Sequence, residues 1–123
     1  EEELKPVLEK IKNALGDRVK DVVSSIRLYE SPSCIVVDEN DPTMKMQQMM
    51  KALGQADLPE VKPILEINPD HAIVTRLKAS EDDAVINDIS QLLLEQAMLV
   101  EGMQLKDPAE FVSRMNRYLE KAV

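Results

Sequence analysis

Several residue types are scarce in this chain of 123 residues. It has one cysteine, three glycines, two tyrosines, one phenylalanine and no tryptophan. The single cysteine, Cys34, excludes an internal disulfide framework and is typical of a reducing compartment. With so few aromatic residues, the core must be built from aliphatic side chains. The length suits a single domain covering residues 1–123.

Long apolar runs are also missing. No segment approaches the length of a membrane span, and no charged stretch followed by an apolar one indicates a signal peptide. The net charge is −8, and an acidic surface repels phosphate backbones and anionic lipids. We therefore expect neither nucleic acid nor membrane as a partner. The sequence starts at Glu1 without an initiator methionine, which predicts a piece of a longer protein.

Catalytic and metal-binding patterns are equally scarce. The only histidine, His71, is interpreted as a capping or packing residue, because its sequence neighbour Asp70 would not face it on a helix. Cys34 lies in an apolar segment and is interpreted as a small hydrophobic residue. These two residues cannot form a standard zinc site, and isolated glycines form no phosphate-binding loop. We predict no enzyme, no metal and no cofactor; a hydrolase using His71 or Cys34 is the alternative.

Capping residues and glycines mark the helix boundaries. Helix starts are indicated by Asp41-Pro42, Asn68-Pro69, Ser80 with Asp83, and Asp107-Pro108 with Glu110, and helix ends by Gly16, Gly54 and Gly102. The predicted helices cover 2–15, 42–53, 69–78, 81–101 and 107–122. Apolar segments rich in β-branched residues predict strands at 19–28, 34–37 and 64–67. This order indicates an α+β fold with a small sheet of three strands and about five helices.

The segment 42–53 contains four of the seven methionines. Met46, Met49, Met50 and Leu53 follow at i, i+3, i+4 and i+7, so they share one helix face. Such a stripe ordinarily faces the core, and exposing it would forgo roughly 1.5–3 kcal/mol for each side chain. The alternative is an exposed surface whose flexible thioethers fit irregular partners. Periodicity alone favours the core.

The segment 92–100 is apolar almost all round, so every side of that helix must be covered. One side can face the sheet. The other requires the last helix or a second copy of the chain, and a helical hairpin with surplus apolar faces commonly pairs with its twin as a four-helix bundle. We predict a homodimer; the alternative is a monomer whose hairpin folds back onto the first helix.

Three segments carry a family resemblance. They are SPSCIVV at 31–37, ILEINPDHAIVTRL at 64–77, and the stretch from LLLEQA at 92–97 through Asp107-Pro108 to Phe111 and Arg114-Met115-Asn116. The middle segment is the most specific. Together they resemble the C-terminal domain of the ninety-kilodalton heat-shock chaperone family, in its bacterial form, over nearly the whole chain.

The resemblance implies a fold and an assembly. The family domain is a small mixed sheet with helices, and it dimerises through its last two helices, which correspond to 81–101 and 107–122. The contact residues here would be Leu94, Ala97, Met98, Phe111, Met115, Tyr118 and Leu119. The family binds ATP and magnesium in a separate N-terminal domain, so the resemblance implies no cofactor and no ATPase in this chain.

The resemblance also implies a role. An amphipathic helix of the family projects into the cleft between protomers and contacts nonnative client proteins. By its position this helix is 42–53, so Met46, Met49, Met50 and Leu53 would be exposed client-binding residues, the reverse of the expectation from periodicity. The alternative is an adaptor whose Met-rich groove docks one specific partner helix.

Two features depart from the family pattern. The chain stops at Val123 without the acidic tail by which cytosolic eukaryotic members recruit helical-repeat co-chaperones, which predicts a bacterial or organellar source and, for a bacterial one, a cytoplasmic location. The helix 42–53 is also unusually rich in methionine, so contacts made by relatives need not transfer atom for atom.

Overall fold

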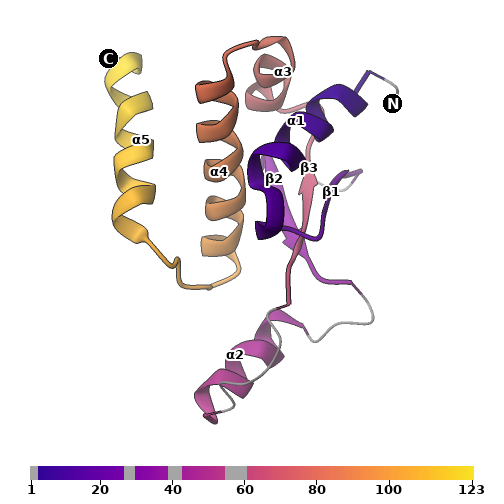
Figure 1. Cartoon of the computed structure of the whole chain (residues 1–123), viewed down its shortest axis with the longest axis vertical. Helices are drawn as coiled ribbons and strands as arrows, with labels where there is room; N and C mark the ends of the chain where they lie inside the picture. The colour runs from indigo at the N-terminus through magenta and orange to yellow at the C-terminus, as the bar shows by residue number, and fades with distance from the viewer. Residues whose placement is uncertain (1–2, 27–29, 39–42, 55–60) are drawn as a thin grey trace.

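A computed structural model describes residues 3–26, 30–38, 43–54 and 61–123. In these ranges the chain forms five α-helices, one 3-10 helix and three strands (Figure 1). In chain order they are α1 (Lys5–Leu15), η1 (Gly16–Arg18), β1 (Asp21–Ser24), β2 (Ser33–Val36), α2 (Met44–Ala52), β3 (Ile64–Ile67), α3 (Ala72–Ala79), α4 (Asp83–Val100) and α5 (Pro108–Ala122). The predicted α+β class is confirmed.

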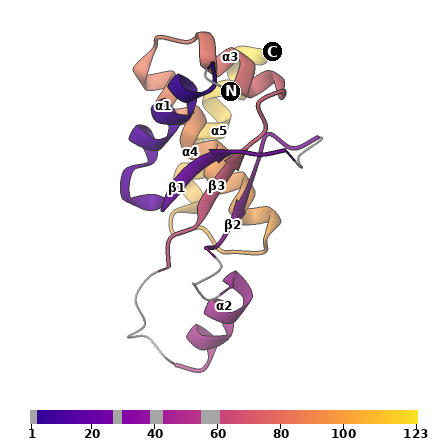
Figure 2. The same ribbon diagram turned by 90° about the vertical axis from the view of Figure 1, so that its right-hand side faces the viewer.

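The sheet is mixed, with the strand order β1-β3-β2. The central strand β3 runs parallel to β1 and antiparallel to β2, and its Leu65 pairs with Val22 on one side and Ile35 on the other. All three side chains are buried, because cross-strand partners point to the same face of a sheet. Helices α1 and α4 pack against the sheet (Figure 2). The core between these two layers is aliphatic, as the scarcity of aromatic residues predicted.

Two of the three strands differ from their predicted bounds. The predicted strand 19–28 is reduced to β1, whose four residues match the four residues of β3 with which they pair. Ile26, beyond the end of β1, is exposed, and residues 27–29 lie outside the described residues. The strand predicted at 34–37 is shifted by one residue to Ser33–Val36. The third strand, Ile64–Ile67, has its predicted bounds.

Helix ends agree with the prediction at the glycines. Gly54 and Gly102 follow α2 and α4 with φ angles of 82° and 80°. That left-handed conformation is open to glycine without a Cβ clash and ends a helix. At the start of α5, the Oδ1 atom of Asp107 accepts a hydrogen bond of 3.0 Å from the Glu110 N–H, and Pro108 occupies the first helical position. This predicted cap is confirmed.

The predicted starts of α3 and α4 are wrong by two to three residues. Asn68 and Pro69 do not begin α3; His71 is its N-cap, and its Nδ1 atom accepts a hydrogen bond of 3.1 Å from the Ile73 N–H. Asn68 instead holds a turn, because its Oδ1 atom accepts from the Asp70 N–H and its Nδ2 atom donates to the Ser31 carbonyl.

At α4, Asp82 is the N-cap in place of the predicted Ser80, and its Oδ1 atom accepts from the N–H groups of Ala84 and Val85. Ser80 is the C-cap of α3. Its hydroxyl oxygen accepts a hydrogen bond from the Asp82 N–H, so it shapes the turn between the two helices.

The starts of α1 and α2 also lie later than predicted. The first helix begins at Lys5, with Leu4 as its N-cap. In α2 the N-cap is Thr43, whose Oγ1 atom accepts a hydrogen bond of 3.2 Å from the Met46 N–H. The predicted cap at Asp41 and Pro42 lies outside the described residues.

Helices α2 and α5 are the least covered parts of the fold. Helix α2 stands away from both layers (Figures 1 and 2), and it has no extensive packing against another described element. Helix α5 lies along α4, its one extensive neighbour among the described elements, and contains no fully buried residue. None of the described helices has both the length and the apolar character of a membrane span.

Candidate functional site

The apolar face of α2 is largely open to solvent. Met46, Met49 and Leu53 are 50%, 63% and 76% exposed, and Met50 is half-buried. The predicted exposure is confirmed for the first three residues, and Met50 is more covered than predicted. Lys45 and Gln48, which lie off this stripe, are exposed as well. The face is therefore an apolar patch on a projecting helix.

Such exposure costs stability. Burying a large apolar side chain contributes roughly 1.5–3 kcal/mol, so each exposed residue of the stripe forgoes a sizeable part of that. A typical domain is stable by only about 5–15 kcal/mol. Contiguous exposed apolar residues usually mark interaction surfaces. The α2 face is thus a candidate surface for binding an apolar partner.

A second apolar stripe runs along α5. Phe111, Arg114 and Tyr118 are the half-buried residues of this helix. Val112, Met115 and Leu119, each one position further along, are exposed. Because one position rotates a helix by about 100°, these two sets form adjacent stripes. The Val112–Met115–Leu119 stripe therefore lies beside the residues that face α4.

Exposed apolar residues of α4 lie at the same end of the hairpin as Val112. Leu99 is partly exposed, and Val100 is almost wholly so. Figure 1 shows this end of α4 next to the start of α5. The hairpin therefore presents apolar side chains from both helices to solvent.

The predicted dimer-contact residues divide into three groups. Leu94 and Ala97 are buried inside the single chain and belong to its core, so they have no surface left for a second chain. Met98, Phe111 and Tyr118 are half-buried. Met115 and Leu119 are exposed. Val112, Leu99 and Val100 are exposed apolar residues outside that set, although the spacing of Val112 from Met115 and Leu119 indicated a shared face.

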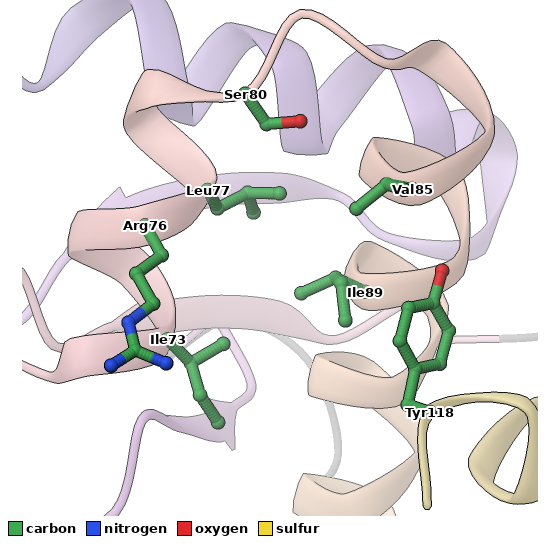
Figure 3. Close-up of a pocket in the computed structure, with 7 residues that line it drawn as sticks. All are labelled: Ile73, Arg76, Leu77, Ser80, Val85, Ile89 and Tyr118. Carbon is green, nitrogen blue, oxygen red and sulfur yellow. The ribbon is translucent and has the colours of Figure 1, made fainter. Parts of the chain in front are cut away.

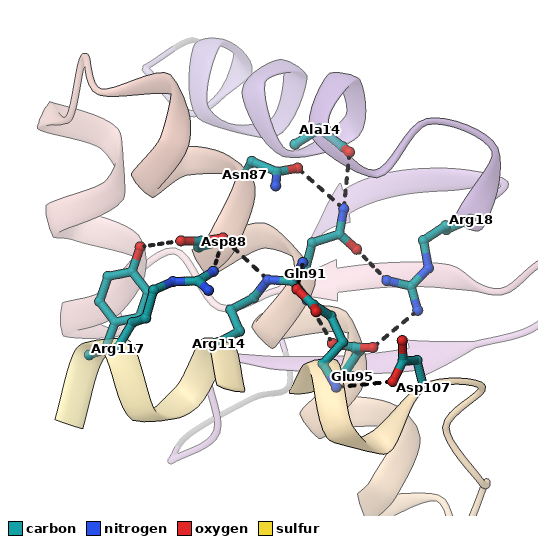
Figure 4. Close-up of polar contacts among 11 residues, drawn as sticks. Ala14, Arg18, Asn87, Asp88, Gln91, Glu95, Asp107, Arg114 and Arg117 are labelled. Carbon is teal, nitrogen blue, oxygen red and sulfur yellow. Dashed lines mark hydrogen bonds and ion pairs between the residues drawn. The ribbon is translucent and has the colours of Figure 1, made fainter. Parts of the chain in front are cut away.

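A polar cluster joins α5 to α4 (Figure 4). The Oδ1 atom of Asp88 accepts hydrogen bonds from Nε of Arg114 at 3.2 Å and Nη2 of Arg117 at 2.9 Å. Its Oδ2 atom accepts a bond of 2.9 Å from the hydroxyl of Tyr118. One carboxylate on α4 thus holds three side chains of α5.

These contacts shift two pKa values. Partial burial raises the pKa of the Asp88 carboxyl, but the hydrogen bonds from Tyr118, Arg117 and Arg114 outweigh it and the pKa lies below its usual value. Burial, together with the hydrogen bond to the Asp88 carboxylate, raises the pKa of Tyr118 to about 12. Asp88 therefore stays ionised and Tyr118 stays protonated at neutral pH.

Glu95 extends the cluster towards the first helix. Its side chain is 6% exposed, its Oε1 atom lies 3.4 Å from Nη1 of Arg114, and its Oε2 atom lies 3.4 Å from Nη2 of Arg18. Arg18 also donates to Gln91, whose amide donates to the carbonyl of Ala14 at the end of α1. The buried carboxylate therefore connects η1 with α5 through α4.

The sequence already indicated that Glu95 would be buried and paired with an opposite charge, although the prediction did not include it. It is the one charged residue within the apolar run from Leu92 to Met98. A charge inside such a run is buried with its helix and requires an opposite charge beside it. The identity of its partners was not visible, because Arg18 and Arg114 lie on other elements.

The two residues considered for catalysis lie on different elements. His71 caps α3. Cys34 is half-buried in β2, and its Sγ atom lies 3.6 Å from a carboxylate oxygen of Glu66. Reactive cysteines occur in electropositive surroundings, which a neighbouring carboxylate does not provide. In the described ranges, no group of three or more histidine, cysteine or acidic residues could hold a metal ion.

A shallow hollow of about 280 Å³ lies between α3, α4 and α5 (Figure 3). Its lining includes Ile73, Leu77 and Ile89, with Arg76 and Ser80 as polar neighbours and the ring of Tyr118. Small-molecule sites usually measure roughly 300–1,000 Å³ and are mostly apolar with a few polar groups. The Tyr118 hydroxyl is already bonded to Asp88. The hollow is therefore at the small end of this range, and one of its polar groups is already engaged within the chain.

Comparisons with known proteins match the whole chain. A family model described as Hsp90 protein covers residues 1–123. Chaperone protein HtpG of Treponema denticola is 57% identical over 119 residues, which make up 97% of this chain and 19% of that protein. The proteins of the same name from Treponema pallidum and Burkholderia lata are 48% and 53% identical over 98% and 96% of this chain. The chain spans about a fifth of the length of these curated relatives.

Proposed function

The chain belongs to the Hsp90 family, and from that premise we propose that residues 1–123 are the C-terminal dimerisation and client-contact domain of a longer, ATP-dependent bacterial chaperone. The clients are unfolded or partly folded proteins, which the domain contacts through α2. The relatives named chaperone protein HtpG support the chaperone role. The observation that carries the client-contact role is the exposed apolar face of α2.

The physical argument for client contact concerns what α2 offers. Nonnative proteins expose apolar side chains of varied size and shape. Unbranched thioether side chains adapt to such surfaces better than branched aliphatic ones. Met46 and Met49 are exposed on a helix that stands away from the core, so a client can reach them without displacing a packed element.

The argument for dimerisation concerns α5. This helix packs on one side against α4 and carries the exposed stripe Val112, Met115 and Leu119 on the adjacent side. A second copy of the hairpin, related by a two-fold axis, would cover this exposed stripe in each of the two chains. The two hairpins together would complete a four-helix bundle. Leu94 and Ala97 are left out of this proposed contact because they are already buried.

The proposal includes the absence of enzyme activity in this chain. The parent protein would bind ATP and magnesium in another domain and act in the bacterial cytoplasm. This domain would hold two protomers together and present α2 to the client. We expect neither nucleic acid nor membrane to be a partner.

Client contact is tested with an unfolded probe, reduced carboxymethylated lactalbumin carrying a fluorophore. The double variant Met46→Gln/Met49→Gln should bind the probe at least about tenfold more weakly than the parent chain, because the apolar contacts are lost. Gln48→Ala, on another face of α2, is the matched control and should bind as the parent chain does. Equal binding by the double variant contradicts client contact through α2.

The same assay separates the chaperone role from the adaptor alternative. A chaperone surface should bind several unrelated unfolded chains with similar, weak affinity. An adaptor should bind one peptide saturably and tightly and ignore the unfolded probe. Tight binding restricted to a single helical peptide would favour the adaptor.

Dimerisation is tested by sedimentation of the 13.9-kDa chain at micromolar concentration. The parent chain should sediment as a dimer. Met115→Glu/Leu119→Glu should shift it to monomer, because the charges would be buried unpaired in the contact. Ile26→Glu, at an exposed apolar residue outside the hairpin, should leave the dimer intact. A monomeric parent chain contradicts this part of the proposal.

A further inference from the structure

Two methionines of α2 are more exposed than the methionines of the hairpin, whereas Met50 of α2 is half-buried. Met46 and Met49 are 50% and 63% exposed. Met98 and Met103 are half-buried and packed against the core, and Met115 is 36% exposed. Oxidation of a thioether requires that the oxidant reach the sulfur atom, so it follows exposure. Met46 and Met49 are therefore the more accessible targets among these methionines.

We propose that Met46 and Met49 are sites of reversible oxidation to methionine sulfoxide, with hydrogen peroxide as the oxidant. A lone pair of the thioether sulfur attacks one peroxide oxygen, the S–O bond forms and the O–O bond breaks. The oxygen now bound to sulfur gives its proton to the departing hydroxide, which leaves as water, and the sulfoxide remains. Sulfur loses two electrons and the peroxide gains two.

The reverse reaction needs a thiol reductant. Methionine sulfoxide reductases return the thioether with two thiols as electron donors, which become a disulfide while the sulfoxide oxygen leaves as water. Reversal is useful only where the oxidised protein stays folded. Met46 and Met49 are outside the core and α2 has no extensive packing against another described element, so the added oxygen leaves the core intact. The same change at Met103, which packs against the core, would disturb packing.

The consequence at α2 is a change of surface chemistry. A sulfoxide is polar and chiral, whereas the thioether is apolar and flexible. Oxidation of both residues would place two strong hydrogen-bond acceptors on the face that also carries Leu53. This consequence rests on the proposed function, because it matters only if that face binds apolar partners. The site then works as a switch that lowers client binding under peroxide.

The first experiment measures the modification itself and does not depend on client binding. The intact chain is exposed to limiting hydrogen peroxide, and peptide mass spectrometry follows sulfoxide formation at each methionine. Met46 and Met49 should oxidise on the order of fivefold faster than Met103. Circular dichroism should show the sheet and helices retained when these two sites are oxidised. Oxidation of Met103 at an equal or higher rate, or loss of the fold, overturns the proposal.

The second experiment measures binding of the labelled unfolded lactalbumin before and after peroxide. In the parent chain the dissociation constant should rise about tenfold or more and recover after treatment with methionine sulfoxide reductases and dithiothreitol. In Met46→Leu/Met49→Leu, whatever its starting affinity, the dissociation constant after peroxide divided by that before peroxide should stay near one. Met103→Leu is the control and should keep the ratio of the parent chain.

The outcomes distinguish the two proposals. If the untreated parent chain fails to bind the probe, the proposed function fails, and the oxidation rates still test the modification. If the parent chain binds the probe equally well when both residues are confirmed as sulfoxides, the switch is excluded, and the Met46→Gln/Met49→Gln variant then decides whether α2 contacts clients.

Discussion

The hydroxyl of Tyr118 donates a hydrogen bond of 2.9 Å to the Oδ2 atom of Asp88, thirty residues earlier in the chain. The bond joins the second half of α5 to the first half of α4. It needs a protonated tyrosine and an ionised aspartate, which are the states that the shifted pKa values favour. The polar contact therefore helps to fix the hairpin, and with it the position of the exposed α5 stripe.

The raised pKa of Tyr118 predicts a specific loss of stability in alkali. The folded-state pKa of about 12 lies above the ordinary value of 10.0. The contribution of this group is therefore fully present below pH 10 and is lost as the pH rises through 10 towards 12. Urea unfolding at pH values on either side of 10 should show a falling free energy of unfolding, and Tyr118→Phe should remove much of that slope.

A titration checks the same shift directly. The chain has two tyrosines and no tryptophan, so in a Tyr29→Phe variant the ultraviolet absorbance of tyrosinate reports Tyr118 alone. Its midpoint should lie clearly above 10 while the chain remains folded. A midpoint at the ordinary value would show that the Asp88 contact does not persist in solution.

Glu95 and Glu110 allow a buried and an exposed ion pair with the same arginine to be compared. Both contact Arg114, but the Glu95 side chain is buried and that of Glu110 is 51% exposed. Glu95→Gln should cost about 1–3 kcal/mol of unfolding free energy, because it leaves buried donors of Arg114 poorly paired. The loss is limited because Arg114 keeps its contact with Asp88. Glu110→Gln should cost less than about 0.5 kcal/mol. Equal costs in urea unfolding contradict a buried role for Glu95.

Local chemistry made some helix ends predictable and others not. Asp107 was predicted correctly as a cap because it directly precedes Pro108 and stands three residues before Glu110, so both signals indicate the same residue. The start of α4 was wrong because Ser80, Asp82 and Asp83 can all accept hydrogen bonds from a first turn. The choice among them depends on where α3 ends, which is at Ala79 with Ser80 as its C-cap. Such a choice is made by the fold and not by the residue type.

The surfaces were predictable to a different extent. Periodicity placed Met46 and Met49 on one face of α2, but the same spacing describes buried and exposed stripes. Whether the stripe is buried or exposed depends on whether another element covers the helix. The exposure of α2 was inferred from the family resemblance. The pairing of Glu95 with Arg18 and Arg114 joins residues 77 and 19 positions apart, so no local pattern could indicate it.

His71 should contribute to stability through its capping bond. Removing the acceptor in His71→Ala leaves the Ile73 N–H without its side-chain partner and should cost about 0.5–2 kcal/mol. His71→Asn supplies another side-chain acceptor and should recover most of that loss. The comparison is made by urea unfolding at neutral pH. If the asparagine variant is as unstable as the alanine variant, the role of His71 is not capping.

Leu65 and Met49 provide a last contrast, between the core and the projecting helix. Leu65 is fully buried in the central strand, so Leu65→Ala should cost about 2–5 kcal/mol by leaving a cavity. Met49 is mostly exposed, and alanine is a better helix former than methionine, so Met49→Ala should change the free energy of unfolding by less than about 0.5 kcal/mol. Urea unfolding of the two variants gives both values. A large cost at Met49 would mean that α2 packs onto the core in solution, and then neither its exposure nor a binding role for its methionines could hold.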